Sequence, residues 1–290
     1  MNYVLYNSLA NNKQGKKLVD AYIEKHQKEM QLKDVIEIEY DVFMKNLKKE
    51  DEVTIVGGDG TLNHFINEIG DKKIECNIYL VPAGTGNDFY HDITVDNQEE
   101  RILLNPYLDN LPIVYVNGIT KKFINGIGFG IDGYCCEVGD ALKEKSNKPI
   151  NYTSIAIKGL LFHFKPVTAK VTVDGVTEEF TKVWLAPTMK GRFYGGGMMV
   201  APNQDRNKIG VVTTVVYHTP SKIKALMAFP SIFKGEHIKK EKMVKVFTGK
   251  EIKVEFDKPT ALQIDGETIQ NVTSYMVRAC LLYTSDAADD

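Results

Sequence analysis

The sequence predicts an α/β domain followed by a β-rich domain, for three reasons. Strand-like and helix-like patterns alternate through the first hundred or so residues, as they do in a sheet that carries helices on its faces. After about residue 110 this alternation gives way to many short β-branched or aromatic runs. A chain of 290 residues with 43% hydrophobic residues is also long enough for two domains that each bury a core.

Apolar spacing predicts the elements of the first domain, residues 1–112, in order. The expected strands are Tyr3–Tyr6, Val35–Tyr40, Val53–Val56 and Ile78–Val81. The expected helices are Gln14–Glu29, Phe43–Lys49 and a segment whose buried face is Leu62, Phe65, Ile66 and Ile69. In that last helix Thr61 is the expected N-cap and Gly70 the expected stop. This order of strands and helices predicts Rossmann-like layers.

The second domain, residues 113–278, is predicted to be a β-sandwich. The expected strands are Ile113–Val116, Val167–Val173, Val183–Ala186, Ile209–Tyr217 and Ile252–Phe256, with helical interruptions at Thr153–Phe164 and Ser221–Phe233. Asp174-Gly175 lies between two alternating runs and predicts a hairpin turn. Residues 279–290 read ACLLYTSDAADD, without the lysines that are frequent before them, and we interpret them as a non-native tail.

Composition argues against several functions. Lys and Arg total 36 against 38 for Asp and Glu, a formal charge of -2, so we expect no nucleic-acid partner. The four cysteines lack CxxC spacing and the six histidines lack a metal-binding spacing, which predicts no zinc site and a reducing, cytoplasmic setting. We also expect neither a signal peptide nor a transmembrane segment.

A glycine-rich loop follows a buried strand in the segment IVGGDGTLNHFINEI, residues 55–69. Glycine lets the backbone approach a ligand, and the helix start that follows attracts an anion such as phosphate. A carboxylate at Asp59 would repel a bare phosphate, which indicates a metal-bound nucleotide. A tight strand-to-helix connection is the alternative interpretation. The candidate ligand residues here are Gly57, Gly58, Asp59, Gly60, Thr61 and Asn63.

A second loop of the same kind occurs in LVPAGTGNDF, residues 80–89. Ligands of open α/β sheets collect beyond the carboxyl ends of the strands, so the two loops predict one nucleotide site. The candidate residues of this loop are Gly84, Thr85, Gly86, Asn87 and Asp88. A later glycine run, NGIGFGIDG, indicates close packing or a second edge of the site, with Asp132 facing the cleft.

Five motifs occur in a fixed order along the chain: GGDGT at 57–61, PAGTGND at 82–88, GIGFGID at 126–132, YGGGMMVAP at 194–202 and DGE at 265–267. Together they resemble the bacterial diacylglycerol kinase family, relatives of the sphingosine kinases. GGDGT alone is shared with NAD kinases and phosphofructokinases, whereas the later motifs are more specific to lipid kinases. The resemblance implies an NAD-kinase-like α/β domain, a β-sandwich, and an active site between them.

The resemblance also implies the cofactors ATP and Mg²⁺. Asn7, the first glycine loop and Thr85 would contact ATP, and Asp59 and Asp88 would belong to the acidic network around magnesium, to which we add Asp132. Phosphoryl transfer depends mainly on positioning and on charge neutralisation by the metal, so these residue types suit the chemistry.

The catalytic base implied by the resemblance is Asp265 or Glu267, and their spacing does not decide between them. The residues alone favour a hairpin turn at Asp265-Gly266, and the resemblance reverses that preference. The acceptor would be a lipid hydroxyl, with diacylglycerol giving phosphatidate as the favoured reaction.

The chain departs from the family pattern at two places. Asn7-Ser8 replaces the usual Asn-Pro pair of the first loop. After the AP motif, the family carries an acidic segment of the DDG type that binds a structural metal, whereas residues 203–210 read NQDRNKIG. With one carboxylate, Asp205, beside Arg206 and Lys208, we expect this second metal to bind weakly or not at all.

Three functions stay open on the sequence: a lipid kinase, an NAD kinase that phosphorylates a ribose, and a nucleotide-binding regulator without activity. The lysines and apolar residues between Lys222 and Lys240 favour peripheral contact with an anionic membrane at its inner face, against the simpler interpretation of a solvated helix. The resemblance is also compatible with a homodimer.

Overall fold

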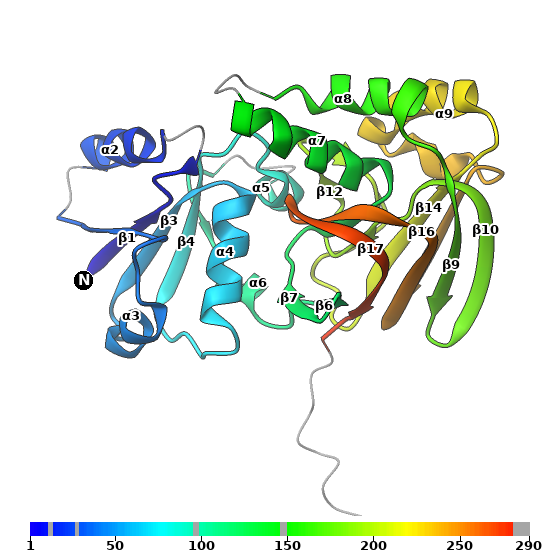
Figure 1. The fold of residues 1–290 in the computed structure, drawn as a ribbon. Coiled ribbons are helices and arrows are strands. Elements are labelled where there is room, and N and C mark those ends of the chain that lie inside the picture. The colour runs from blue at the N-terminus through cyan, green and yellow to red at the C-terminus, as the bar shows by residue number, and fades with distance from the viewer. Residues whose placement is uncertain (11–13, 27–28, 95–98, 146–149, 281–290) are drawn as a thin grey trace, which may run out of the picture.

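The computed structural model describes residues 1–10, 14–26, 29–94, 99–145 and 150–280, in two domains side by side (Figure 1). The first domain holds a five-stranded sheet of order β2-β1-β3-β4-β5, in which β5 alone runs antiparallel to its neighbour. Its strands are β1 Asn2–Tyr6, β2 Gln31–Asp34, β3 Glu52–Gly57, β4 Asn77–Pro82 and β5 Ile102–Leu103. Because β1, β3 and β4 are parallel neighbours, their carboxyl ends meet at one edge of the sheet.

Helices cover both faces of this sheet. They are α2 Gly15–His26, α3 Tyr40–Asn46, α4 Asp59–Ile69, α5 Asp88–Ile93 and α6 Asn105–Leu108. Leu5 and Ile55 pack with Phe65 of α4 on one face, whereas Val4 packs with Val19 of α2 on the other. Successive strand residues point to opposite faces, so the apolar runs of β1 and β3 supply both cores.

Two expectations about the first domain are wrong. The strand expected at Val35–Tyr40 is instead Gln31–Asp34, which pairs with β1, and after it the chain turns before α3 begins. β2 is a polar edge strand. The apolar residues of the expected strand lie in the turn after β2 and at the start of α3, where Val35 and Tyr40 are buried and Ile36 is exposed. The N-cap of α4 is Gly58, not Thr61, which is buried inside the helix. Gly70 is confirmed as the C-cap.

The second domain is built on a ten-stranded sheet. Its strands are β6 Ile113–Val116, β7 Ile119–Lys122, β8 Gly126–Phe129, β9 Val167–Val173, β10 Val176–Leu185, β11 Thr188–Met189, β14 Val212–His218, β15 Val244–Gly249, β16 Glu251–Ile264 and β17 Glu267–Arg278. A small hairpin, β12 Phe193–Tyr194 with β13 Met198–Met199, lies beside it. One half of β16 pairs with β9 and the other half with β8, so the bent strand closes the sheet into a sandwich.

Several strands of this domain have other bounds than expected. Val183–Leu185 of one expected strand form the end of the longer β10, and Ala186 lies beyond it. Ile252–Phe256 is only the first part of β16. The strand expected from Ile209 begins at Val212, after a turn in which Gly210 has a φ of 72°. Residues 281–290 of the expected tail, and residues 27–28 of the first expected helix, lie outside the described residues.

Helices lie against one end of the sandwich (Figure 1). They are α7 Ile131–Lys145, α8 Tyr152–Lys158, the π-helix η1 Gly159–His163, α9 Lys222–Ala228, and the 3₁₀-helices η2 Phe229–Lys234 and η3 Glu236–Lys239. Trp184 of the sheet packs beneath them with Leu160 and Phe229 in one hydrophobic cluster. Among the residues that the structure describes, no helix is both long enough and apolar enough to cross a bilayer.

Candidate active site

The two glycine loops meet at the carboxyl ends of β3 and β4. A Cβ atom on Gly58 would lie 2.8 Å from the Cα of Gly84, and one on Gly84 would lie 2.6 Å from the Cα of Gly58. Neither position can carry a side chain without moving the other loop. Asn87 fixes the second loop, because its Nδ2 donates to the Gly84 carbonyl at 2.8 Å and its Oδ1 accepts from the Gly84 amide at 3.0 Å.

The start of α4 is open beside these loops. A Cβ atom on Gly60 would have no neighbour within 4 Å, so the fold itself does not require glycine there. The first amides of a helix and the positive end of its dipole attract phosphate. Asn7 follows β1 at the same edge, where its Oδ1 accepts a hydrogen bond from the Leu9 amide at 2.9 Å.

Asp59 holds three segments together. Its carboxylate accepts hydrogen bonds from the amides of Asp88 at 2.8 Å and Phe89 at 2.9 Å, which are the first amides of α5. It also accepts from Nδ2 of Asn125 at 2.9 Å. Asp59 therefore supplies the cap that Asn87, the N-cap residue of α5, does not provide through its own side chain.

Asp88 joins the first domain to the β12–β13 hairpin of the second. Its carboxylate accepts hydrogen bonds from the amides of Gly196 at 2.8 Å and Gly197 at 2.6 Å. Burial, together with the negative charge of Asp59, raises the pKa of Asp88 to about 6. The site thus holds two neighbouring carboxylates and has an excess of negative charge that a divalent cation would neutralise.

Asp265 lies in the β16–β17 turn, where φ is 45° at Asp265 and 93° at Gly266. Its carboxylate accepts four hydrogen bonds, from Nδ2 of Asn63 at 2.8 Å and from the backbone amides of Ile124 at 2.7 Å, Asn125 at 2.9 Å and Gly126 at 2.9 Å. Burial raises the pKa of Asp265 above its ordinary value, although these hydrogen bonds favour the charged form. The turn is therefore a hairpin and also part of the site.

The other two predicted acids lie apart from this group. Glu267 is exposed, and its carboxylate forms an ion pair with Nζ of Lys121 at 2.5 Å. Asp132, at the start of α7, accepts a hydrogen bond from the Tyr194 hydroxyl at 2.6 Å. Burial raises the pKa of Asp132 to about 6.

One cavity of about 720 Å³ is lined by six of the predicted site residues, which come from both domains. The predicted residues that line it are Asp59, Thr85, Gly86, Asp88, Asp132 and Asp265. Its remaining wall is largely apolar and comes from the second domain, with Ile131, Ala156, Leu185, Val200, Phe229 and Ile232 among the lining residues. A polar end and an apolar end in one cavity suit an amphiphilic ligand beside a phosphate donor.

The acidic residues fit a magnesium ion that arrives with a nucleotide. Within the described ranges, no group of three His, Cys, Asp or Glu side chains forms a ready metal cage. Mg²⁺ does not need one, because it keeps several waters and binds through one or two carboxylates and substrate phosphates. Asp59 and Asp88 both line the cavity and interact through their charges, so this pair matches that donor set.

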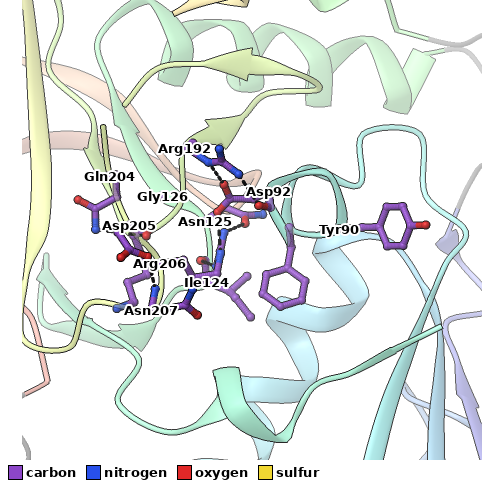
Figure 2. A network of polar contacts seen from close by, with 12 residues as sticks. Tyr90, Asp92, Ile124, Asn125, Gly126, Arg192, Gln204, Asp205, Arg206 and Asn207 are labelled. Carbon is purple, nitrogen blue, oxygen red and sulfur yellow. Dashed lines mark hydrogen bonds and ion pairs between the residues drawn. The ribbon is translucent and has the colours of Figure 1, made fainter. Parts of the chain in front are cut away.

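A buried arginine occupies the segment in which the family pattern has acidic residues. Figure 2 shows Arg192 and Arg206 converging on Asp92 of α5. Arg206 donates from Nε to Asp92 at 2.7 Å, from Nη2 to Oδ1 of Asn125 at 2.8 Å, and from Nη1 to the Ile124 carbonyl. Arg192 donates from Nε to the other oxygen of Asp92 at 2.6 Å. The arginines thereby link the two domains through one carboxylate.

The residue that sequence reasoning missed is Asn125. It connects the two acids of the site, because its side chain binds Asp59 and its backbone amide binds Asp265. Arg206 in turn orients that side chain. A signal was present, since Asn125 directly precedes the glycine run of residues 126–133.

Comparisons with known families agree with this architecture. The diacylglycerol kinase catalytic domain matches residues 2–108. The YegS C-terminal NAD kinase beta sandwich-like domain matches residues 125–279, more than half of the chain.

Individual proteins are similar over most of the chain. A Mycobacterium tuberculosis protein named diacylglycerol kinase is 29% identical over 204 residues, which are 66% of this chain and 62% of that protein. A proposed lipid kinase of Bacillus subtilis, YtlR, is 28% identical over 73% of this chain and 72% of its own length. A crystal structure from Bacillus anthracis, of a proposed diacylglycerol kinase, superposes with a TM-score of 0.66 over 96% of this chain and 91% of that one, at 18% identity.

Proposed function

We propose that this chain, which belongs to the bacterial diacylglycerol and lipid kinase family, is an ATP- and Mg²⁺-dependent kinase that phosphorylates a lipid hydroxyl. Diacylglycerol is the acceptor that we favour, with phosphatidate as the product. The observation that carries the proposal is the cavity that has the glycine loops and acids at one end and apolar side chains at the other.

The polar end suits the phosphates of ATP. The open start of α4 at Gly60 offers amides and a helix dipole, and Thr85 and Gly86 line the cavity beside it. Asp59 and Asp88 would hold Mg²⁺ through its water shell, and the ion would neutralise charge on the transferring phosphoryl group. Hydrogen bonds to both acids from fixed backbone amides keep them in place before ATP binds.

Asp265 is the base that we favour. It lines the cavity, whereas Glu267 is paired with Lys121 on the surface. As the lipid oxygen bonds to the γ-phosphorus and ADP leaves, the hydroxyl proton would pass to the Asp265 carboxylate. A raised pKa makes a carboxylate a better proton acceptor, and the four hydrogen bonds fix its orientation.

The apolar end suits an acyl chain better than a second nucleotide. Side chains such as Ala156, Phe229 and Ile232 offer no hydrogen bonds to a ribose or a phosphate. We therefore favour the lipid acceptor over NAD. Since ATP is the donor, we also propose that the protein acts in the cytoplasm, at the inner face of the membrane.

The test is to incubate the protein with labelled ATP, Mg²⁺ and mixed micelles that contain diacylglycerol, with NAD in a parallel reaction. Asp265→Asn protein tests the base, and Asp20→Asn is the matched control because Asp20 is exposed on α2. We expect labelled phosphatidate from the wild type and from Asp20→Asn. Asp265→Asn should be slower by about 100-fold or more.

Other products would overturn the proposal in recognisable ways. Label in NADP would assign the protein to the nucleotide kinases. ATP binding without transfer to either acceptor would favour the inactive regulator.

A further inference from the structure

Large apolar side chains are exposed together on the helices of the second domain. Phe162 of η1 is 73% exposed, and Ile223 and Met227 of α9 are 70% and 76% exposed. Large apolar side chains on α8 and η2 are also exposed, to a smaller extent. We define the docking surface as the exposed side chains of Tyr152, Ile157, Phe162, Ile223, Met227 and Phe233. Exposed apolar side chains gathered in this way mark an interaction site, unlike single scattered ones.

The helices that carry the docking surface form one unit. Nζ of Lys222 donates to the Leu161 carbonyl at 3.3 Å, which ties α9 to η1. The inner sides of both elements pack into the same hydrophobic cluster through Leu160 and Ala225. Figure 1 shows α8 and α9 next to each other at the top of the domain. The buried inner sides of these elements therefore leave the exposed apolar side chains on their outer sides, on helices that pack together.

The two segments that carry the docking surface are basic. Residues 150–165 and 221–235 contain no Asp or Glu. They carry five lysines, namely Lys158, Lys165, Lys222, Lys224 and Lys234. The whole chain has a formal charge of -2, so this positive region departs from the average surface. Exposed apolar side chains with lysines on the same helices match the chemistry of an anionic membrane surface.

The docking surface also reaches the cavity of the candidate active site. Tyr152 and Phe233 belong to both, because each is exposed and each lines the cavity. A lipid that left a bilayer at this surface would enter the apolar end of the cavity.

We propose that the docking surface binds the face of a bilayer that carries anionic phospholipid, with Phe162, Ile223 and Met227 inserted among the lipids. The delivery of an acceptor to the cavity rests on the proposed function, whereas the binding itself does not. Each lysine near an anionic membrane contributes about five-fold in affinity, so the lysines supply much of the attraction.

The test is flotation of the full chain with vesicles of phosphatidylcholine, with and without phosphatidylglycerol, in the absence of ATP and diacylglycerol. The apolar variant is Phe162→Ser with Met227→Ser, and its matched control is Val176→Ser. Val176 is 70% exposed but begins β10 at the hairpin turn, which lies at the opposite end of the domain from α8 and α9 (Figure 1). The charge variant replaces Lys158 and Lys224 by Gln.

The control for the charge variant replaces Lys170 and Lys245, which are exposed on the sheet, by Gln. We expect wild type and both controls to bind anionic vesicles, with binding weaker at high salt. The charge variant should bind roughly 25-fold more weakly, and the apolar variant at least about ten-fold more weakly. Urea unfolding of each variant checks that the fold is intact.

Three results would overturn the inference. The wild type would fail to bind anionic vesicles at low salt, or the apolar variant would bind as well as Val176→Ser. Alternatively, sedimentation would find that the apolar variant turns a dimer into a monomer while vesicle binding stays unchanged, which would make this surface a contact between copies. If the variants lose vesicle binding and the wild type phosphorylates no lipid, the docking surface is supported and only the proposed function is refuted.

Discussion

Arg206→Met tests whether the buried arginine holds the two domains together. The change removes a guanidinium that binds Asp92, Asn125 and the Ile124 carbonyl and lies 4.6 Å from the centre of the Phe89 ring. Removing one partner of a buried ion pair destabilises a protein by roughly 3–5 kcal/mol. Since Asp92 keeps its ion pair with Arg192, the loss should be near the lower limit, about 3 kcal/mol.

The assay for Arg206→Met is urea or thermal unfolding, and a loss of this size lowers Tm by roughly 6–12 °C in a protein of this length. The matched control is Arg278→Met, because Arg278 pairs with Glu251 on the surface at a similar distance of 2.7 Å. Solvent screens an exposed pair, so this control should stay near the wild type. Equal stability of the two variants would refute the role of Arg206.

The remaining predictions concern the glycine loop and two of the acids. Gly58→Ala should lower the free energy of unfolding by about 1–3 kcal/mol, since its Cβ would lie 2.8 Å from the backbone of Gly84. Gly60→Ala is the matched control, because there is open space around Gly60, and it should change the free energy of unfolding by less than about 0.5 kcal/mol. Equal urea midpoints of the two variants would contradict this. Burial raises the pKa of Asp132 to about 6 from 3.8, so the folded state keeps a proton that the unfolded chain has released, and stability falls as pH rises through that window. The wild type should therefore lose up to about 3 kcal/mol of unfolding free energy relative to Asp132→Asn as the pH rises from 4 to 7. A difference in unfolding free energy that stays constant over this pH range would exclude this. Glu267→Gln should keep its rate of phosphoryl transfer within about three-fold, because an exposed ion pair contributes little; a loss near 100-fold would make Glu267 the base.

Much of the fold could be predicted from the sequence because its strands are apolar and its turns have glycine or Asp-Gly. β3 and β4 are buried runs that end in glycines, and Asp174-Gly175 makes a hairpin with φ angles of 48° and 86°. The edge strand Gln31–Asp34 was missed because it has few apolar residues. Its partner β1 determines where it lies, and that pairing leaves no local pattern.

The sequence likewise predicts some features of the candidate site and not others. Asp59 and Asp265 lie in short motifs, so their positions could be predicted, although the hydrogen bonds that occupy their carboxylates could not. The ion pair between Arg206 and Asp92 joins residues 114 positions apart. Only tertiary packing brings them together. The sequence therefore indicated that Arg206 weakens a second metal site, and it did not indicate that Arg206 links the two domains.

Transfer of label from ATP to diacylglycerol in micelles tests the central claim most directly, provided that calorimetry first establishes ATP binding by each protein. We predict Mg²⁺-dependent phosphatidate from the wild type, and a loss of about 100-fold or more in Asp265→Asn while ATP still binds. A folded, ATP-binding wild type that labels no lipid would contradict the account, as would an Asp265→Asn variant that transfers label at the wild-type rate.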